Sequence, residues 1–400
     1  MRDSLTIPLP ERGPNLDRAI TFDQFLKERR PRLNAGIPWR IFRDALGDFR
    51  LARVRVRIPH FEQSVECGWP RDHSTPLGRA IGRLRRYYDW PEGLASWYSD
   101  AYRSVSILSY VLAAAAVTLA LLPIAMGWVN EAHVHLEIVC VALELAALVA
   151  ILALVIVCGN RHWLGRWIDY RLAAELLRHV RLVGPVGGGR SIPPTQAHLA
   201  SYRHPGATWA AWYARAVERS LGLPNARVDQ AYLRSVASDL LHMIRGQLNY
   251  HEATASRAHR IEDRLHGAGI LCFAAALVCC VVHLLPHSWP SFEQFHFAPE
   301  LMGMLCAWFP ALGAACAGIN NVGEYRRVAK RSEAMARALK QLLERTEALS
   351  HIIDGQSSAP DEIPVSARLA DLASEASQVM VNEVLDWRVV FLDRPPEVPA

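Results

Sequence analysis

Residues 136–158 read LEIVCVALELAALVAILALVIVC and decide the fold. A helix of about 20 apolar residues, rising about 1.5 Å per residue, crosses a hydrocarbon core of about 30 Å. Three more apolar runs of similar length follow the same pattern: Val105–Gly127, Gly267–Leu285 and Glu300–Ile319. Soluble proteins rarely carry four such runs in two closely spaced pairs. We therefore predict an all-α integral membrane protein with four transmembrane helices in two hairpins.

The cations lie on one side of these runs. All 44 Lys and Arg residues fall in segments 1–104, 159–266 and 320–400, and the connectors Trp128–His135 and Pro286–Pro299 contain none. Cations beside membrane spans are retained in the cytoplasm. We therefore expect a multi-pass protein of the cell inner membrane with both termini, a small N-terminal segment and helical extensions in the cytoplasm. The net charge of +5 suits anionic headgroups, so we expect the lipid bilayer, and no nucleic acid, as a partner.

The chain divides into five predicted parts. These are a cytoplasmic segment (1–94), a two-span hairpin with flanking helices (95–182), a linker with a short cytoplasmic helix (183–228), a second hairpin with long flanking helices (229–353) and a C-terminal helix with its tail (354–400). A weak internal repeat relates the two hairpins, because each one has a charged helix on both sides of its spans.

Local patterns in the N-terminal part predict short elements. Phe22–Arg29 and Pro38–Leu46 have helical spacing, as does Leu77–Tyr88. Leu51–Ile58 (LARVRVRI) alternates apolar and charged residues, as a half-buried strand does. Asp89–Gly93 (DWPEG) predicts a turn before the helix that enters the first span.

The polar segments that follow predict four helices, over Thr208–Leu221, Asp229–His266, Tyr325–Ile353 and Val365–Leu392, and Arg161–Leu182 is expected to continue the second span. Apolar residues of the third helix recur at alternating spacings of four and three: Met335, Leu339, Leu342, Thr346, Leu349 and Ile353. That spacing is typical of a packing seam. The seam closes either a bundle within one chain or a contact between protomers.

Glu137 and Glu144 are the two acidic residues inside the second run. They are seven apart and share one helix face. An ionised side chain near the bilayer midplane is costly, so it faces a bundle interior, a partner or water. Glu144 is either a pore or proton-pathway residue or a protonated glutamate hydrogen-bonded between helices, unless the span boundary is misplaced. His283, near the end of the third span, is a candidate partner.

Small residues recur in the fourth run: Gly303, Ala311, Ala314, Ala315 and Gly318. Small side chains four apart let helices approach closely. These positions serve packing within the chain or an oligomer seam, and we expect the protein to form a homo-oligomer.

Signals of enzyme chemistry are weak. The chain contains no P-loop, GxGxxG or GxSxG, and His251-Glu252 lacks the second His of an HExxH site. Seven of the eight cysteines lie in the apolar runs without metal-ligand spacing. We therefore expect no enzyme, no catalytic residue, no metal and no cofactor.

Five stretches are specific in sequence although no chemistry demands them. They are Trp97–Ser104 (WYSDAYRS), Arg166–Arg171 (RWIDYR), Leu223–Arg227 (LPNAR), Gly246–His251 (GQLNYH) and Glu383–Arg388 (EVLDWR). They resemble the membrane half of bacterial proteins that accompany SLOG-type (TRPM-like) nucleotide sensors, and the two-transmembrane effector domains associated with SMODS and SLOG proteins. The resemblance covers residues 95–400. It implies a role in bacterial stress or anti-phage defence, where a nucleotide signal from a cytoplasmic sensor protein triggers a membrane effector.

Residues 1–104 show no Gly-rich nucleotide-binding motif, so a sensor would be either a separate protein or absent. Our leading hypothesis is an effector that oligomerises and perturbs or permeabilises the inner membrane. The alternative is a membrane-anchored scaffold or receptor that docks cytoplasmic partners without forming a pore.

Overall fold

The computed structural model describes residues 21–48, 69, 74–128, 131–188, 192–193, 205–288, 299–355 and 363–392, and all their regular elements are helical. In chain order these are α1 (Phe22–Leu26), α2 (Ile37–Gly47), α3 (Pro76–Ala125), α4 (Val134–Asn160), α5 (Trp163–Val183), α7 (Trp209–Leu221), α8 (Gln230–Ser288), α9 (Pro299–Gly323), α10 (Tyr325–Ile353) and α11 (Val365–Leu392). Three short 3-10 helices join them: η3 (Glu131–His133), η4 (Gly184–Val186) and η5 (Pro205–Ala207). The all-α class is thus confirmed for the described residues. The strand predicted at Leu51–Ile58 lies outside them.

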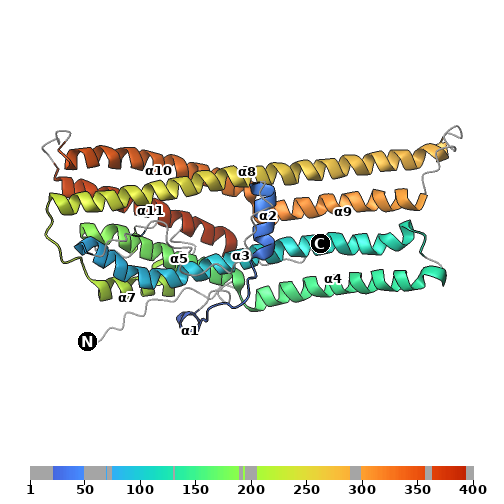
Figure 1. The fold of residues 1–400 in the computed structure, drawn as a ribbon, viewed down its shortest axis with the longest axis horizontal. Helices are drawn as coiled ribbons and strands as arrows, with labels where there is room; N and C mark the ends of the chain where they lie inside the picture. The colour runs from blue at the N-terminus through green and yellow to red at the C-terminus, as the bar shows by residue number, and fades with distance from the viewer. Residues whose placement is uncertain are drawn as a thin grey trace, which may run out of the picture.

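The molecule is elongated and has two halves (Figure 1). The apolar half holds α4, α9 and the C-terminal parts of α3 and α8. The polar half holds α5, α7, α10, α11 and the N-terminal parts of α3 and α8. Four helices are long and apolar enough to cross a membrane, and between 6% and 22% of each apolar window is buried within the chain. The apolar surface is therefore left outward, as a lipid-facing segment requires.

The four helices of the apolar half lie in a single layer. α4 packs on α3, α3 packs on α9, and α9 packs on α8. One of these contacts requires a glycine, because a Cβ added at Gly318 would clash with the Tyr110 ring of α3. At Gly313 an added Cβ would be in ordinary van der Waals contact, 3.6 Å from the Gly269 carbonyl oxygen of α8. The order α4–α3–α9–α8 encloses no interior.

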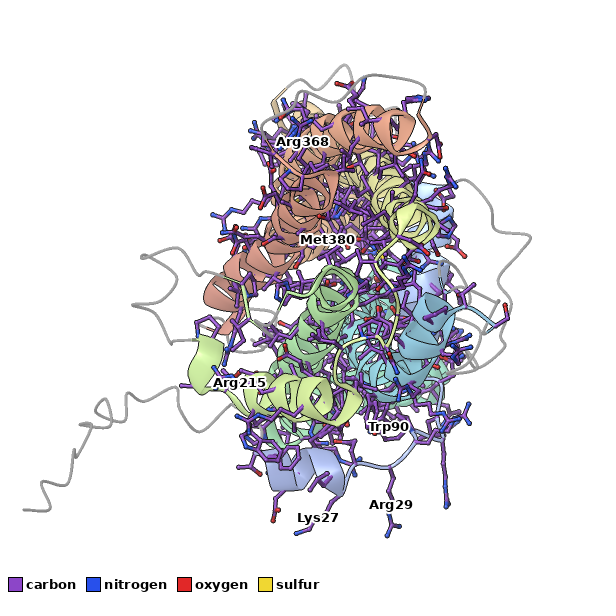
Figure 2. The ribbon with its side chains drawn as sticks, turned by 90° about the vertical axis from the view of Figure 1, so that its left-hand side faces the viewer. Lys27, Arg29, Trp90, Arg215, Arg368 and Met380 are labelled. Carbon is purple, nitrogen blue, oxygen red and sulfur yellow. The ribbon has the colours of Figure 1, made fainter. Side chains whose placement is uncertain are left out.

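The polar half is a packed bundle. The predicted seam of α10 is buried along its whole length against α8 and α11. This confirms the interpretation as a bundle within one chain. Viewed end-on, Met380 of α11 lies among the helices, whereas Lys27 and Arg29 point away from them (Figure 2).

Each time the chain passes from the apolar half back to the polar half, one residue adopts the left-handed backbone conformation. His162 (φ 52°) lies between α4 and α5, and Glu324 (φ 47°) lies between α9 and α10. A left-handed conformation costs a non-glycine residue roughly 1–2 kcal/mol. The helix predicted over Arg161–Leu182 is confirmed as α5, but it does not continue the second span, because the left-handed His162 interrupts the helix between α4 and α5. The same break in each half matches the internal repeat.

Side-chain caps explain why several helices begin where they do. Thr75 Oγ1 accepts from Gly78 N–H at the start of α3, and Thr208 Oγ1 accepts from Ala211 N–H at the start of α7. The predicted turn at Asp89–Gly93 is wrong, since α3 continues through Pro91. A proline removes one helical hydrogen bond, and the burial of Tyr88 and Leu94 on either side outweighs that loss.

Candidate functional site

A cavity of about 1450 Å³ lies in the polar half between the long helices α3 and α8. It exceeds the roughly 300–1,000 Å³ usual for small-molecule sites. Its walls are rich in hydroxyl, aromatic and charged groups at helical spacing. α3 contributes Tyr88, Glu92, Ser96, Ser99, Arg103 and Ser106, and α8 contributes Ser238, His242, Gly246, Tyr250, Thr254 and Arg257. Ser96 and Tyr250 are also exposed, so the cavity opens to solvent between these two helices.

The middle of the cavity contains a network of ion pairs. Arg171 of α5 donates to both Glu92 oxygens at 2.9 and 3.0 Å and pairs with Glu175 at 2.8 Å. Arg178 also contacts Glu175 and donates to the Tyr88 oxygen at 2.6 Å. Burial raises the pKa of Glu92, but Arg171 and Arg178 outweigh it and hold that pKa below its usual range. The Glu92 carboxylate therefore stays ionised beside these arginines, and removing one member of such a buried pair would leave an uncompensated charge.

Beside this network lies a buried pair of titratable side chains, His251 of α8 and Glu383 of α11. His251 Nε2 is 3.6 Å from Glu383 Oε2, and His251 is 1% exposed. Burial, reinforced by Arg171 and Arg178, lowers the pKa of His251 to about 4. Burial raises the pKa of Glu383 to about 7, although Arg171 opposes the rise. Glu383 therefore titrates near neutral pH while His251 stays neutral.

Aromatic residues and arginines form the end of the cavity nearest the apolar half. The Arg103 guanidinium lies 5.0 Å from the ring centroids of Trp39 and of Trp167. Arg40 Nη2 lies 3.0 Å from Asp100 Oδ2, and the Trp39 backbone N–H donates to Ser104 Oγ at 3.1 Å. Helix α2 therefore forms part of this end and is fixed to α3.

The same helix is also fixed to α8. It lies across α3 and α8 where the two halves of the molecule meet (Figure 1). Arg260 Nε donates to the Gly47 carbonyl, and Arg264 donates to the Leu46 carbonyl. The last carbonyl groups of a helix have no hydrogen-bond donor within the helix, and an arginine that donates to them supplies one. Its positive charge also interacts favourably with the negative end of the helix dipole. α2 therefore connects the two long helices at the boundary.

Glu137 and Glu144, the acidic residues singled out in the second run, lie half-buried on α4. They share a face with the buried residues Cys140 and Ala147, and that face packs on α3. His283 lies on α8, at the other edge of the layer, with α3 and α9 in between. Within one chain the structure therefore does not bring Glu144 and His283 together.

The small residues of α9 divide into two sets. Gly318 lies against Tyr110 of α3, and Ala311 and Ala315 are half-buried. Gly303 and Ala314 are exposed, and nothing lies within 4 Å of a Cβ added at Gly303. The chain therefore uses part of this set for its own packing and leaves the rest uncovered.

The cavity residues were not singled out as a site by sequence reasoning, although the specific stretches pointed to them. Four of the five stretches converge on the cavity wall, through Asp100 and Arg103, Trp167 and Arg171, Gln247 and Tyr250, and Glu383 and Trp387. The fifth contributes Leu223 and Pro224 to a smaller pocket beside η4. Polar and aromatic residues at helical spacing, without catalytic chemistry, were the signal of this cavity.

Comparison with known proteins adds no relative: no family model, no curated protein and no solved structure matches this chain. The class of protein follows from the fold. The described chain is all-helical, with four helices long and apolar enough to cross a membrane, and this indicates a membrane protein.

Proposed function

We propose that this chain is a multi-pass effector of the bacterial inner membrane. Its four spans form two hairpins with both termini cytoplasmic. A nucleotide signal in a stress or anti-phage system, passed on by a cytoplasmic sensor protein, leads it to oligomerise and permeabilise the membrane. One observation carries the proposal: α3 and α8 each run without a break from the cavity wall into the apolar half.

A continuous helix is a stiff connection between the two halves. Glu92 and Arg103 line the cavity on the same helix that forms the apolar segment after Val105. A ligand or partner that moves α3 relative to α8 would therefore shift the two spans as well. α2 is bonded to both helices at the boundary between the polar and apolar halves, so it would couple their movement there.

Permeabilisation needs more than one copy, because a single layer of helices encloses no passage. The uncovered face of α9 and the outward apolar surface of α4 leave room for neighbouring copies. In this proposal Glu144 lines the passage between copies. It is an acidic side chain in the apolar half, and packing within one chain buries it only in part.

Induced expression in a bacterial host with a membrane-potential dye tests the proposal. The wild-type chain should depolarise the membrane, and Glu144→Ala should lose that effect at an equal amount of membrane-inserted protein. Val111→Ala, at a position of α3 in the apolar half that is 51% exposed, is the control and should behave as wild type. Unchanged potential and growth for wild type at high membrane density, even with the activating signal supplied, would refute the permeabilising effector.

The alternative is a membrane-anchored scaffold that docks cytoplasmic partners. The size of the polar half and its open cavity favour it as the second candidate. It predicts no effect of Glu144→Gln on any activity. Deleting residues 365–400 is a poor test of it, because Leu369 and Ala373 of α11 are fully buried and the deletion would expose the bundle core.

A further inference from the structure

Arg103 differs from the other arginines at the membrane-proximal end of the cavity. The others each have a carboxylate partner: Arg40 with Asp100, Arg43 with Asp44, and Arg257 with Asp48. Arg103 is held by the faces of Trp39 and Trp167, at 5.0 Å to each centroid. Within the described part of the chain, no carboxylate pairs with it.

Both cation–π contacts are made to ring faces, which do not accept the N–H groups of Arg103 as a carboxylate would. The planar fork of a guanidinium matches two oxygens of an oxyanion. Arg103 is only partly buried and lines the cavity, so the oxyanion has a route to it.

We propose that the membrane-proximal end of the cavity binds a phosphate-bearing ligand, with the phosphate oxygens on the N–H edge of Arg103. Ser99 and Thr254 line the same cavity and offer hydroxyl groups to further phosphate oxygens. Arg40 and Arg43 are each balanced by a carboxylate, so Arg103 supplies the unbalanced positive charge at this end of the cavity. A phosphate, with three or more oxygens and more than one charge, uses these donors more fully than a carboxylate does.

Two sources supply this chemistry. A soluble phosphate compound reaches the site through the opening beside Ser96 and Tyr250. A phospholipid headgroup is the second source, because the cavity extends to Ile107 and Ile319 at the boundary with the apolar half. The shared requirement is the phosphate–Arg103 contact.

The inference deepens the proposed function by naming the chemistry that the cavity recognises. Its test is independent of permeabilisation, because binding is measured without a membrane potential. A protein that binds phosphate but leaves the potential unchanged would refute only the effector role. A protein that depolarises the membrane without phosphate binding would refute only this inference.

The test uses the full-length protein in a phosphate-free maltoside detergent, titrated with inorganic pyrophosphate by calorimetry. A second arm uses native mass spectrometry of detergent-solubilised protein with equal amounts of phosphatidylglycerol and phosphatidylcholine. We compare wild type with Arg103→Gln and with Arg161→Gln, an exposed arginine at the junction between α4 and α5. Arg103→Lys keeps the charge and loses the two-pronged geometry.

Wild type should bind at least one probe saturably, and Arg103→Gln should weaken that binding about 10- to 100-fold, as expected for loss of a charged hydrogen-bond donor. Arg161→Gln should bind as wild type, and Arg103→Lys should fall between wild type and Arg103→Gln. Saturation by pyrophosphate identifies a soluble ligand, and preferential retention of phosphatidylglycerol identifies a headgroup. Absence of binding in both arms, or equal binding by Arg103→Gln or Arg103→Lys and wild type, overturns the proposal.

Discussion

The buried pair His251–Glu383 makes a prediction in which two substitutions act with opposite sign. Glu383→Gln leaves His251 as the titrating member, and His251→Gln leaves Glu383. Burial is the first cause of both pKa shifts, and neither residue is among the causes of the other's shift. Each single variant should therefore retain the remaining residue's shifted pKa.

The sign follows from which state binds the proton. In Glu383→Gln, His251 has a pKa of about 4 when folded and 6.5 when unfolded, so the unfolded chain holds the extra proton between these values. The free energy of unfolding therefore rises with pH across this window. In His251→Gln, Glu383 has a pKa of about 7 when folded and 4.5 when unfolded, so the folded chain holds the extra proton and stability falls as pH rises.

Each shift amounts to about 3 kcal/mol over its full window, at about 1.4 kcal/mol per pH unit. Between pH 4.5 and 6.5, where the two windows overlap, the variants should diverge by about 3 kcal/mol per pH unit. In wild type the two slopes oppose each other and largely cancel. The double variant His251→Gln/Glu383→Gln removes both and should follow wild type in slope.

The assay is denaturant unfolding in a neutral detergent across this pH range, followed by circular dichroism. All other titrating groups are common to the four proteins, so only differences in slope between them are interpreted. Parallel pH profiles for the two single variants, or slopes of the same sign relative to wild type, would refute the reasoning that burial sets both pKa values.

Two further predictions concern packing. Gly318→Ala should unfold at a free energy about 1–3 kcal/mol lower than Gly303→Ala, because a Cβ clashes with Tyr110 at the first site and meets nothing within 4 Å at the second, while both substitutions gain the same helix propensity. Equal stability of the two in detergent would contradict the α3–α9 contact. Glu28→Gln should speed tryptic cleavage near Lys27 about 5- to 100-fold without changing unfolding of the bundle, because the Glu28 carboxylate accepts from Arg166, Tyr98 and Tyr170 and so holds the N-terminal segment on the bundle. Cleavage at the wild-type rate would show that this contact does not anchor the segment.

Sequence patterns predicted the helices whose signals are local. α10 and α11 begin and end where predicted, and α7 follows the Thr208 cap. The apolar run within α4 needed only length and composition. The misread turn at Asp89–Gly93 shows the limit of such signals, because Pro91 is a local breaker that distant packing overrides.

The cavity could not be predicted because it is a space between helices far apart in sequence. Helical spacing places Ser99 and Arg103 on one face of α3, and Tyr250 and Thr254 on one face of α8. Neither sequence pattern predicts that the two helix faces lie opposite each other with an open space between them. The separation of Glu144 from His283 could not be predicted for the same reason. A short connector predicts that the two helices it joins pack together, but it does not predict how one hairpin packs on the other.

The single-layer order α4–α3–α9–α8 makes each chain comparable to one stave of a barrel. A lone stave holds no water, and the width of any lumen is set by how many staves close around it. If the chains assemble as proposed, the onset of permeabilisation would rise as a high power of the number of chains per unit area of bilayer. Dilution in the membrane would then keep the chains inactive until the signal leads them to oligomerise.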